Sequence, residues 1–284
     1  MRRIALMLTM LAVIGLAGCN NSSTNGKSQK QAKVAHSVTG TVGLMSSIQL
    51  SPKATMQIKL VDASADNAAP LASKTLSPVG PMPVKFTLDF DRAKIDPTHI
   101  YLVQVDLVDG DRTFSMPVQS PVITHDAPTS KVDIRLKANK TPKEKLEDKY
   151  SELQKNLGGY GITNGRQLEK HQSRGWQTFR DNDSGKIVFV RENIEFQKDG
   201  FSNDEYAYKD GKAWYIVTKH KSSQNAKSGE VKRVGWTEDG KLVVNEHQQG
   251  GKTSTLSDKQ VAELKSQAQD MLKLARDKSP AKKQ

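Results

Sequence analysis

The chain has 284 residues, with 43 lysine and arginine residues against 31 aspartate and glutamate residues, a formal net charge of +12, and one cysteine. This length suggests about two domains of roughly 100–200 residues each. A single cysteine excludes an intramolecular disulfide and a cysteine-rich metal site. The hydrophobic fraction of 36% is low for a globular protein but too high for a wholly disordered chain.

Residues 1–18 have the pattern of a signal peptide. Arg2 and Arg3 precede an uncharged, mostly apolar run from Ile4 to Ala17. A helix needs about 20 apolar residues to span a bilayer. The run is therefore shorter than a typical transmembrane helix, but its length suits the apolar part of a signal peptide.

The only cysteine follows this run in the segment Leu16-Ala17-Gly18-Cys19. The segment resembles the lipobox of bacterial lipoprotein signal peptides. The resemblance implies cleavage before Cys19, a diacylglyceryl group on its thiol and a fatty acyl chain such as palmitate on its amino group. Several acyl chains make a durable membrane anchor. Asn20 is not the aspartate that favours inner-membrane retention, which implies the periplasmic leaflet of the outer membrane. An ordinary secretory signal with a chance cysteine is the alternative.

Composition changes twice after the lipobox. Residues 19–37 are polar and small, and they predict a lipidated flexible tether. From Val38 apolar and polar residues alternate with period two, most clearly at 56–60, 84–90, 101–107 and 132–136. Prolines and an Asp-Gly pair separate these runs. Several short strands over about 100 residues predict an immunoglobulin-like β-sandwich for residues 38–137.

Residues 138–159 are charged, and we predict a short helical linker there. Four apolar residues are spaced to share one side of a helix over 144–157, namely Leu146, Tyr150, Leu153 and Leu157. Gly158 and Gly159 end it.

Residues 160–284 predict an antiparallel β-rich region with a C-terminal α-helix. Three turn signals precede apolar runs, at Gly185, Gly211 and Gly240, and such turns favour hairpins. We prefer a plain meander to a duplicated binding repeat. Ser257 and Gln260 fit a helix capping box. The following apolar stripe indicates packing against a sheet: Val261, Leu264, Ala268, Met271, Leu272 and Ala275. The overall prediction is a mainly β chain.

Within 38–137, specific segments carry a family resemblance. These are VTGTV at 38–42, LSPKATMQIKLVD at 50–62, PVKFTL at 83–88, and IDP at 95–97 ahead of YLVQV at 101–105. They resemble the YbaY/YscW lipoproteins, the type III secretion lipoprotein chaperone family. The resemblance implies a periplasmic β-sandwich and a pilotin role, which is to guide secretin subunits to the outer membrane. It supplies no catalytic residues. Residues 138–284 extend beyond the shorter pattern of this family, and we identify no family for them.

Catalytic, metal and cofactor motifs are not found. The six histidines, His36, His99, His125, His171, His220 and His247, show no metal-ligand spacing. There is no nucleophile elbow and no P-loop. Glu192 and Glu195 could meet across a cleft, but solvated carboxylates are the preferred interpretation. We therefore expect no enzyme activity and no cofactor.

Aromatic residues gather in the second region and give an alternative hypothesis. Exposed rings there could bind a glycan, and with a carboxylate could hydrolyse it, although burial in a sheet core is the preferred interpretation. The rings are Trp176, Trp214, Trp236, Tyr206, Tyr208 and Tyr215.

The charge does not indicate nucleic acid, because residues 38–137 have ten basic and ten acidic residues and the excess is spread over the rest. The sequence favours an outer-membrane-anchored periplasmic lipoprotein that binds or assembles an envelope or secretion-system protein. The alternatives are the glycan-binding or hydrolytic module and a structural lipoprotein without a specific ligand.

Overall fold

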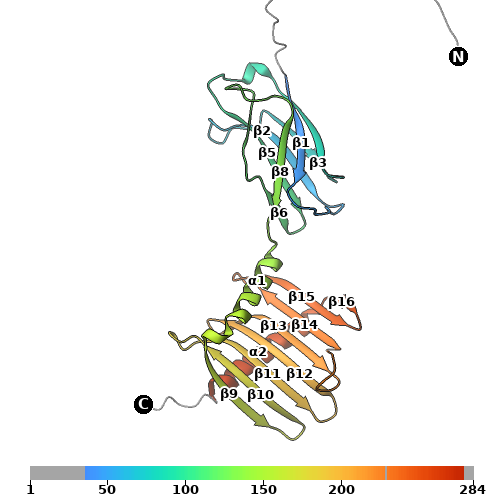
Figure 1. Cartoon of the computed structure of the whole chain (residues 1–284), viewed down its shortest axis with the longest axis vertical. Coiled ribbons are helices and arrows are strands. Elements are labelled where there is room, and N and C mark those ends of the chain that lie inside the picture. The colour runs from blue at the N-terminus through green and yellow to red at the C-terminus, as the bar shows by residue number, and fades with distance from the viewer. Residues whose placement is uncertain (1–35, 228, 278–284) are drawn as a thin grey trace, which may run out of the picture.

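The computed structural model describes residues 36–227 and 229–277. The predicted signal peptide, Cys19 and nearly all of the predicted tether lie outside these residues. The described part contains two eight-stranded sheets, and a helix leads from the first to the second (Figure 1).

Eight strands form the first sheet: β1 (Ser37–Leu44), β2 (Thr55–Asp62), β3 (Ala72–Leu76), β4 (Val84–Asp89), β5 (Tyr101–Asp109), β6 (Arg112–Ser115), β7 (Ser120–Val122) and β8 (Val132–Ala138). The short 3-10 helix η1 (Arg92–Lys94) lies between β4 and β5. The hydrogen-bonded order is β3-β2-β5-β6-β8-β1-β4, and β7 pairs with β5. β1 and β8 run parallel. The sheet folds round on itself into a barrel-like sandwich (Figure 1).

Period-two alternation places the core of this sandwich. In β5, Tyr101, Val103, Val105 and Leu107 are buried, whereas Gln104 and its alternate neighbours point outward. In the same way, the runs predicted at 56–60, 84–90 and 132–136 supply further buried residues of this core from β2, β4 and β8. The predicted mainly β class with an N-terminal sandwich is therefore confirmed.

Helix α1 (Pro142–Lys155) connects the two sheets and is followed by the 3-10 helix η2 (Leu157–Gly159). Thr141 caps it. The Thr141 Oγ1 accepts from the Glu144 N–H at 3.2 Å, and the Glu144 carboxylate accepts from the Thr141 N–H at 2.8 Å. Glu144 also pairs with Arg112 of β6 at 2.6 Å, and this guanidinium holds the pKa of Glu144 at about 2. The ion pair therefore fixes the start of α1 to the first sheet.

Eight further strands form the second sheet: β9 (Gly161–Leu168), β10 (Gln172–Arg180), β11 (Ile187–Phe196), β12 (Gly200–Lys209), β13 (Lys212–Lys221), β14 (Glu230–Trp236), β15 (Leu242–Gln249) and β16 (Lys252–Ser254). They follow one another in chain order from β9 to β16, all antiparallel, so the predicted meander is confirmed. At the β12–β13 turn Asp210 and Gly211 both have positive φ, of 50° and 78°. This is the conformation that the Asp-Gly signal predicts.

Helix α2 (Asp258–Asp277) covers one face of the second sheet, and α1 covers the other (Figure 1). In β13, Tyr215 and Val217 pack with α1, whereas Ile216 packs with α2. Strands buried on both faces have continuous apolar runs in place of alternation. The predicted stripe of α2 is buried, and Ser257 and Gln260 form the predicted capping box.

The helix predicted over 144–157 is observed, and it is part of the second core. All four predicted residues, Leu146, Tyr150, Leu153 and Leu157, pack with the α1-facing side of the sheet. Within residues 36–227 and 229–277, neither α-helix combines the length and apolar character needed to cross a bilayer.

Candidate functional site

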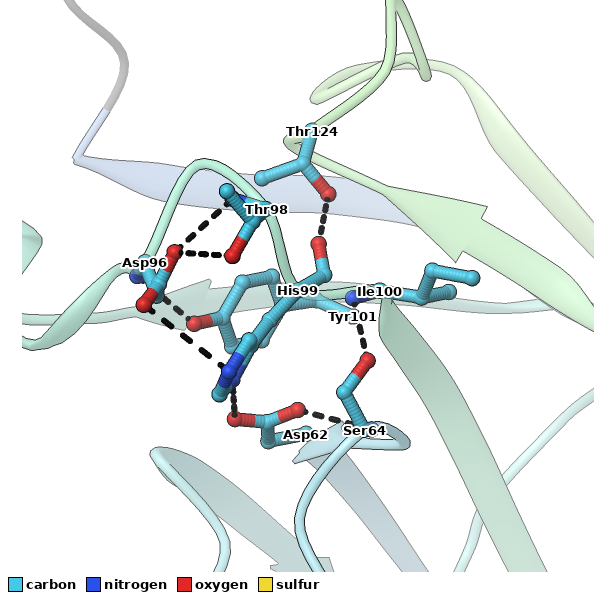
Figure 2. Close-up of polar contacts among 8 residues, drawn as sticks. All are labelled: Asp62, Ser64, Asp96, Thr98, His99, Ile100, Tyr101 and Thr124. Carbon is cyan, nitrogen blue, oxygen red and sulfur yellow. Dashed lines mark hydrogen bonds and ion pairs between the residues drawn. The ribbon is translucent and has the colours of Figure 1, made fainter.

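One end of the first sandwich is organised around His99 (Figure 2). Asp62 closes β2 and faces Tyr101, which opens β5. His99 precedes β5 and places its Nδ1 2.7 Å from the Asp62 Oδ2, and its Nε2 3.8 Å from the Asp96 Oδ2. The hydrogen bond with His99 lowers the pKa of Asp62, and the same bond raises the pKa of His99.

Hydrogen bonds to the backbone connect this cluster to its neighbouring loops. The Thr124 hydroxyl donates to the His99 carbonyl at 2.6 Å, and the Ile100 N–H donates to the Ser64 Oγ at 2.9 Å. The Asp96 N–H donates to the buried Tyr101 hydroxyl at 2.9 Å. Figure 2 shows the His99 ring beside the Asp62 and Asp96 carboxylates, with the Ile100 side chain pointing away from them. Both ring nitrogens of His99 face carboxylates. These contacts and the hydrogen bonds to the backbone hold the neighbouring loops together, which is a structural role.

Strands β3 and β4 end the sheet order of the sandwich. β3 pairs with β2 and β4 pairs with β1, so each is paired along one side. An edge strand leaves backbone donors and acceptors that a partner's strand can meet. In β4, Lys85 and Thr87 are exposed between the buried Phe86 and Leu88.

The aromatic residues of the second region are mostly core residues. Trp176, Tyr206, Tyr208 and Tyr215 are each at most 4% exposed. The Tyr208 hydroxyl donates to the Ala268 carbonyl of α2 at 2.7 Å. The preferred interpretation of these rings as core is confirmed, and it removes them as a stacking surface for a sugar.

Trp214 and Trp236 are half-buried and line a cavity of about 600 Å³. A lysine ammonium group lies over the face of each of these two rings. The Lys149 Nζ lies 4.9 Å from the Trp214 ring centroid, and the Lys265 Nζ lies 5.4 Å from that of Trp236. These cation–π contacts stabilise the junction of α1 and α2 with the sheet.

A second cavity, of about 520 Å³, lies between α2 and the sheet. Its walls are one side of α2 and alternate residues of five neighbouring strands, β10 to β14. Five lining residues are carboxylates, namely Glu192, Asp204, Glu230, Glu263 and Asp270, whereas Arg174 and Lys232 supply two permanent positive charges. A cavity of this size with convergent polar groups is the usual form of a small-ligand site.

Two carboxylates form the buried wall of this cavity. Glu192 and Asp204 lie directly opposite each other on β11 and β12, and they are 2% and 6% exposed. The Tyr206 hydroxyl lies 3.4 Å from both, and the Ser202 hydroxyl donates to Asp204 at 2.6 Å. Burial raises the pKa of Glu192 to about 7 and that of Asp204 to about 6. Burial also raises the pKa of Tyr206.

Arg174 of β10 is the nearest cation to this pair. Its Nε lies 3.3 Å from the Glu192 Oε1 as an ion pair. Neither atom makes a hydrogen bond in the described part of the chain, although both are buried. A buried carboxylate oxygen without a hydrogen bond is costly, and such groups in native proteins call for an explanation.

Glu230 on β14 also lines the cavity, and its charge already has partners. Its Oε1 is 2.7 Å from the His247 Nε2 and 3.1 Å from the Lys232 Nζ. In the described residues no three histidine, cysteine, aspartate or glutamate side chains are grouped to hold a metal ion.

Glu192 and Glu195 do not meet as a pair. The preferred interpretation of both as solvated carboxylates holds for Glu195 and is wrong for Glu192, which is buried. Glu195 is exposed, three residues from Glu192 on the same strand and therefore on the other face of the sheet. The partner of Glu192 is Asp204. The sequence analysis did not predict a role for Arg174 or Asp204. Each occupies a core-facing position of a strand, and a charged residue at such a position could have indicated a buried polar site.

Two histidines have partners that the sequence did not predict, His99 with Asp62 and His247 with Glu230. His220 lines the cavity, and its ring lies 6.3 Å from that of Phe196. His36, His125 and His171 are exposed.

Family comparisons divide the chain as the two sheets do. Residues 33–136 match the model of the type III secretion system lipoprotein chaperone family (YscW), which confirms the resemblance of the first region. Residues 163–283 match the model of a family of proteins of unknown function, DUF1481, in a region where the sequence reasoning identified no family. No curated protein matches the chain.

Among solved structures, the chain is similar to an alternative pilotin from the type II secretion system of Vibrio cholerae. The two are 25% identical over 37% of this chain and 96% of that chain, with a TM-score of 0.33.

Proposed function

We propose that the protein is a lipid-anchored envelope chaperone with a pilotin-like role: its sandwich holds a secretion-system subunit and the lipid on Cys19 takes that subunit to the outer membrane. The observation that carries this proposal is the match of residues 33–136 to the secretion lipoprotein chaperone family. The lipobox-like segment directly before this region supports the anchor.

A non-catalytic role agrees with this family, since a chaperone acts by binding. The sandwich supplies the means for binding, because β3 and β4 are paired along one side only. An extended segment of the partner adds to such an edge through main-chain hydrogen bonds. Hydrogen bonds around His99 hold together the loops that follow β2 and precede β5.

Site-specific photocrosslinking in intact cells tests where the partner binds. A photoreactive amino acid at Thr87 on β4 or at Thr75 on β3 should crosslink to an envelope secretion subunit, because both positions are exposed on edge strands. The same amino acid at Glu195, exposed on the second sheet, is the matched control. Crosslinks from Glu195 alone, or from none of the three positions, would contradict the proposal.

The anchor has a separate test. Cys19→Ser removes the predicted acylation site without changing the sandwich. We expect the variant to leave the outer-membrane fraction and to reduce the amount of partner found there. A variant that stays firmly in the membrane fraction would overturn the lipid anchor and leave the crosslinking result unaffected.

A further inference from the structure

We propose that the cavity between α2 and the second sheet binds a small aliphatic amine, a diamine or polyamine, with one ammonium group at the Glu192–Asp204 pair. This site lies in the DUF1481-matching region, and it is independent of the partner surface on the sandwich.

Glu192 and Asp204 lie opposite each other on the adjacent strands β11 and β12, and Arg174 is the cation paired with Glu192. When both carboxyl groups are ionised, the single guanidinium of Arg174 leaves a net charge of −1 in this buried wall. Like charges directly opposite each other on neighbouring strands are destabilising, and a buried charge needs a partner. One ammonium group supplies the missing positive charge.

An ammonium group has three donors and no acceptor. The wall offers acceptors in the two carboxylates, and the Glu192 Oε1 has no hydrogen bond although Glu192 is only 2% exposed. An ammonium group would satisfy this oxygen, whereas a carboxylate or phosphate ligand would add negative charge to it.

The remaining walls indicate an aliphatic chain and a second ammonium group. Ile194, Phe196, Leu264 and Met271 give the cavity apolar surface between its polar groups. Methylene groups pack on such surface. Glu263 and Asp270 lie on the α2 side of the cavity, and the described residues give neither of them an ion pair within the cavity. They can accept from an ammonium group at the other end of the chain.

Isothermal titration of the purified full chain with putrescine and with spermidine tests the proposal. We expect saturable one-to-one binding of at least one of them. The matched control ligand is 1,4-butanediol, which has the carbon chain of putrescine with hydroxyls in place of the ammonium groups, and it should not bind. Absence of saturable binding by either amine, or equal binding of the diol, would overturn the proposal.

Variants of residues that line the cavity test whether the amine binds there. Glu192→Gln should weaken binding about tenfold, the equivalent of about 1.4 kcal/mol, whereas Glu195→Gln on the opposite face should not change it. The double variant Glu263→Gln with Asp270→Asn alters only exposed side chains of α2, so it tests the site without disturbing the core. Unchanged affinity in both Glu192→Gln and the double variant would show that the amine binds elsewhere.

Discussion

Glu192→Gln should stabilise the second sheet, and the gain should depend on pH. The pKa of Glu192 is raised from 4.5 to about 7 because the carboxylate is buried. Between these values the folded state binds more protons than the unfolded state, so the free energy of unfolding falls as the pH rises through this window. Asp204 and Tyr206 on β12 and Arg174 on β10 lie beside Glu192, and the charges of Asp204 and Glu169 add to the rise of its pKa.

The magnitude follows from the two pKa values. A difference of about 2.5 between 7 and 4.5, at about 1.36 kcal/mol for each unit, corresponds to about 3 kcal/mol. Glutamine has the shape of glutamate and carries no charge, so Glu192→Gln should recover this free energy at about pH 8. At about pH 5 the wild-type carboxyl is protonated in the fold, and the variant should gain little. Arg174 is 24% exposed in its side chain and keeps contact with water.

Urea unfolding followed by tryptophan fluorescence is the assay. All three tryptophans, Trp176, Trp214 and Trp236, lie in the second sheet, so the signal reports on that sheet alone. With a slope of about 2 kcal/mol per molar urea, the midpoint should rise by about 1–2 M at about pH 8.

The control is Glu195→Gln, the same change at an exposed position of β11, which should shift stability by less than about 0.5 kcal/mol. Two results would refute the reasoning: a gain of equal size at both pH values, or a lower midpoint at about pH 8.

Two further predictions concern His99 and Gly165. The imidazole of His99 should titrate in NMR above its ordinary pKa of 6.5 because of Asp62, so the stabilisation by this pair is complete below pH 6.5 and is lost as the pH rises through the raised pKa. Asp62→Asn should return the pKa toward 6.5, and an unchanged value would contradict the assigned cause. Gly165→Ala should destabilise the second sheet by about 1–3 kcal/mol, because the added Cβ would lie 2.2 Å from the Trp176 ring. At Gly175 the nearest atom would be 3.9 Å away, so Gly175→Ala should cost less in the same urea titration.

Local patterns predicted much of the fold because their causes are local. Alternation at 56–60, 84–90, 101–107 and 132–136 identified the sandwich strands β2, β4, β5 and β8. An Asp-Gly pair with positive φ formed the predicted β12–β13 turn, and Ser257 with Gln260 began the last helix. The predicted stripe of α2 is buried residue for residue. The sequence also carries the lipobox-like segment at Cys19, which predicts the anchor independently of the fold.

The cavity could not be predicted in this way. Glu192 and Asp204 are neighbours only because β11 and β12 pair in one register, and Arg174 joins them from a third strand. Likewise His99 meets Asp62 across 37 residues. The period of a strand shows which residues share a face, and the observed strand β11 places Glu192 and Glu195 on opposite faces. The period does not show which residues of the next strand lie opposite.

The sequence by itself predicted strands β2, β4, β5 and β8 of the sandwich, both α-helices, turns at Gly185, Gly211 and Gly240, and the segment that predicts lipid attachment, since each depends on residues close together in the chain. Only the tertiary structure decided that helices cover both faces of the second sheet, and that the Glu192 and Asp204 carboxylates share one buried wall. Those outcomes depend on register and packing between distant segments, and the free energy of burying a charge depends on which groups that packing brings near it.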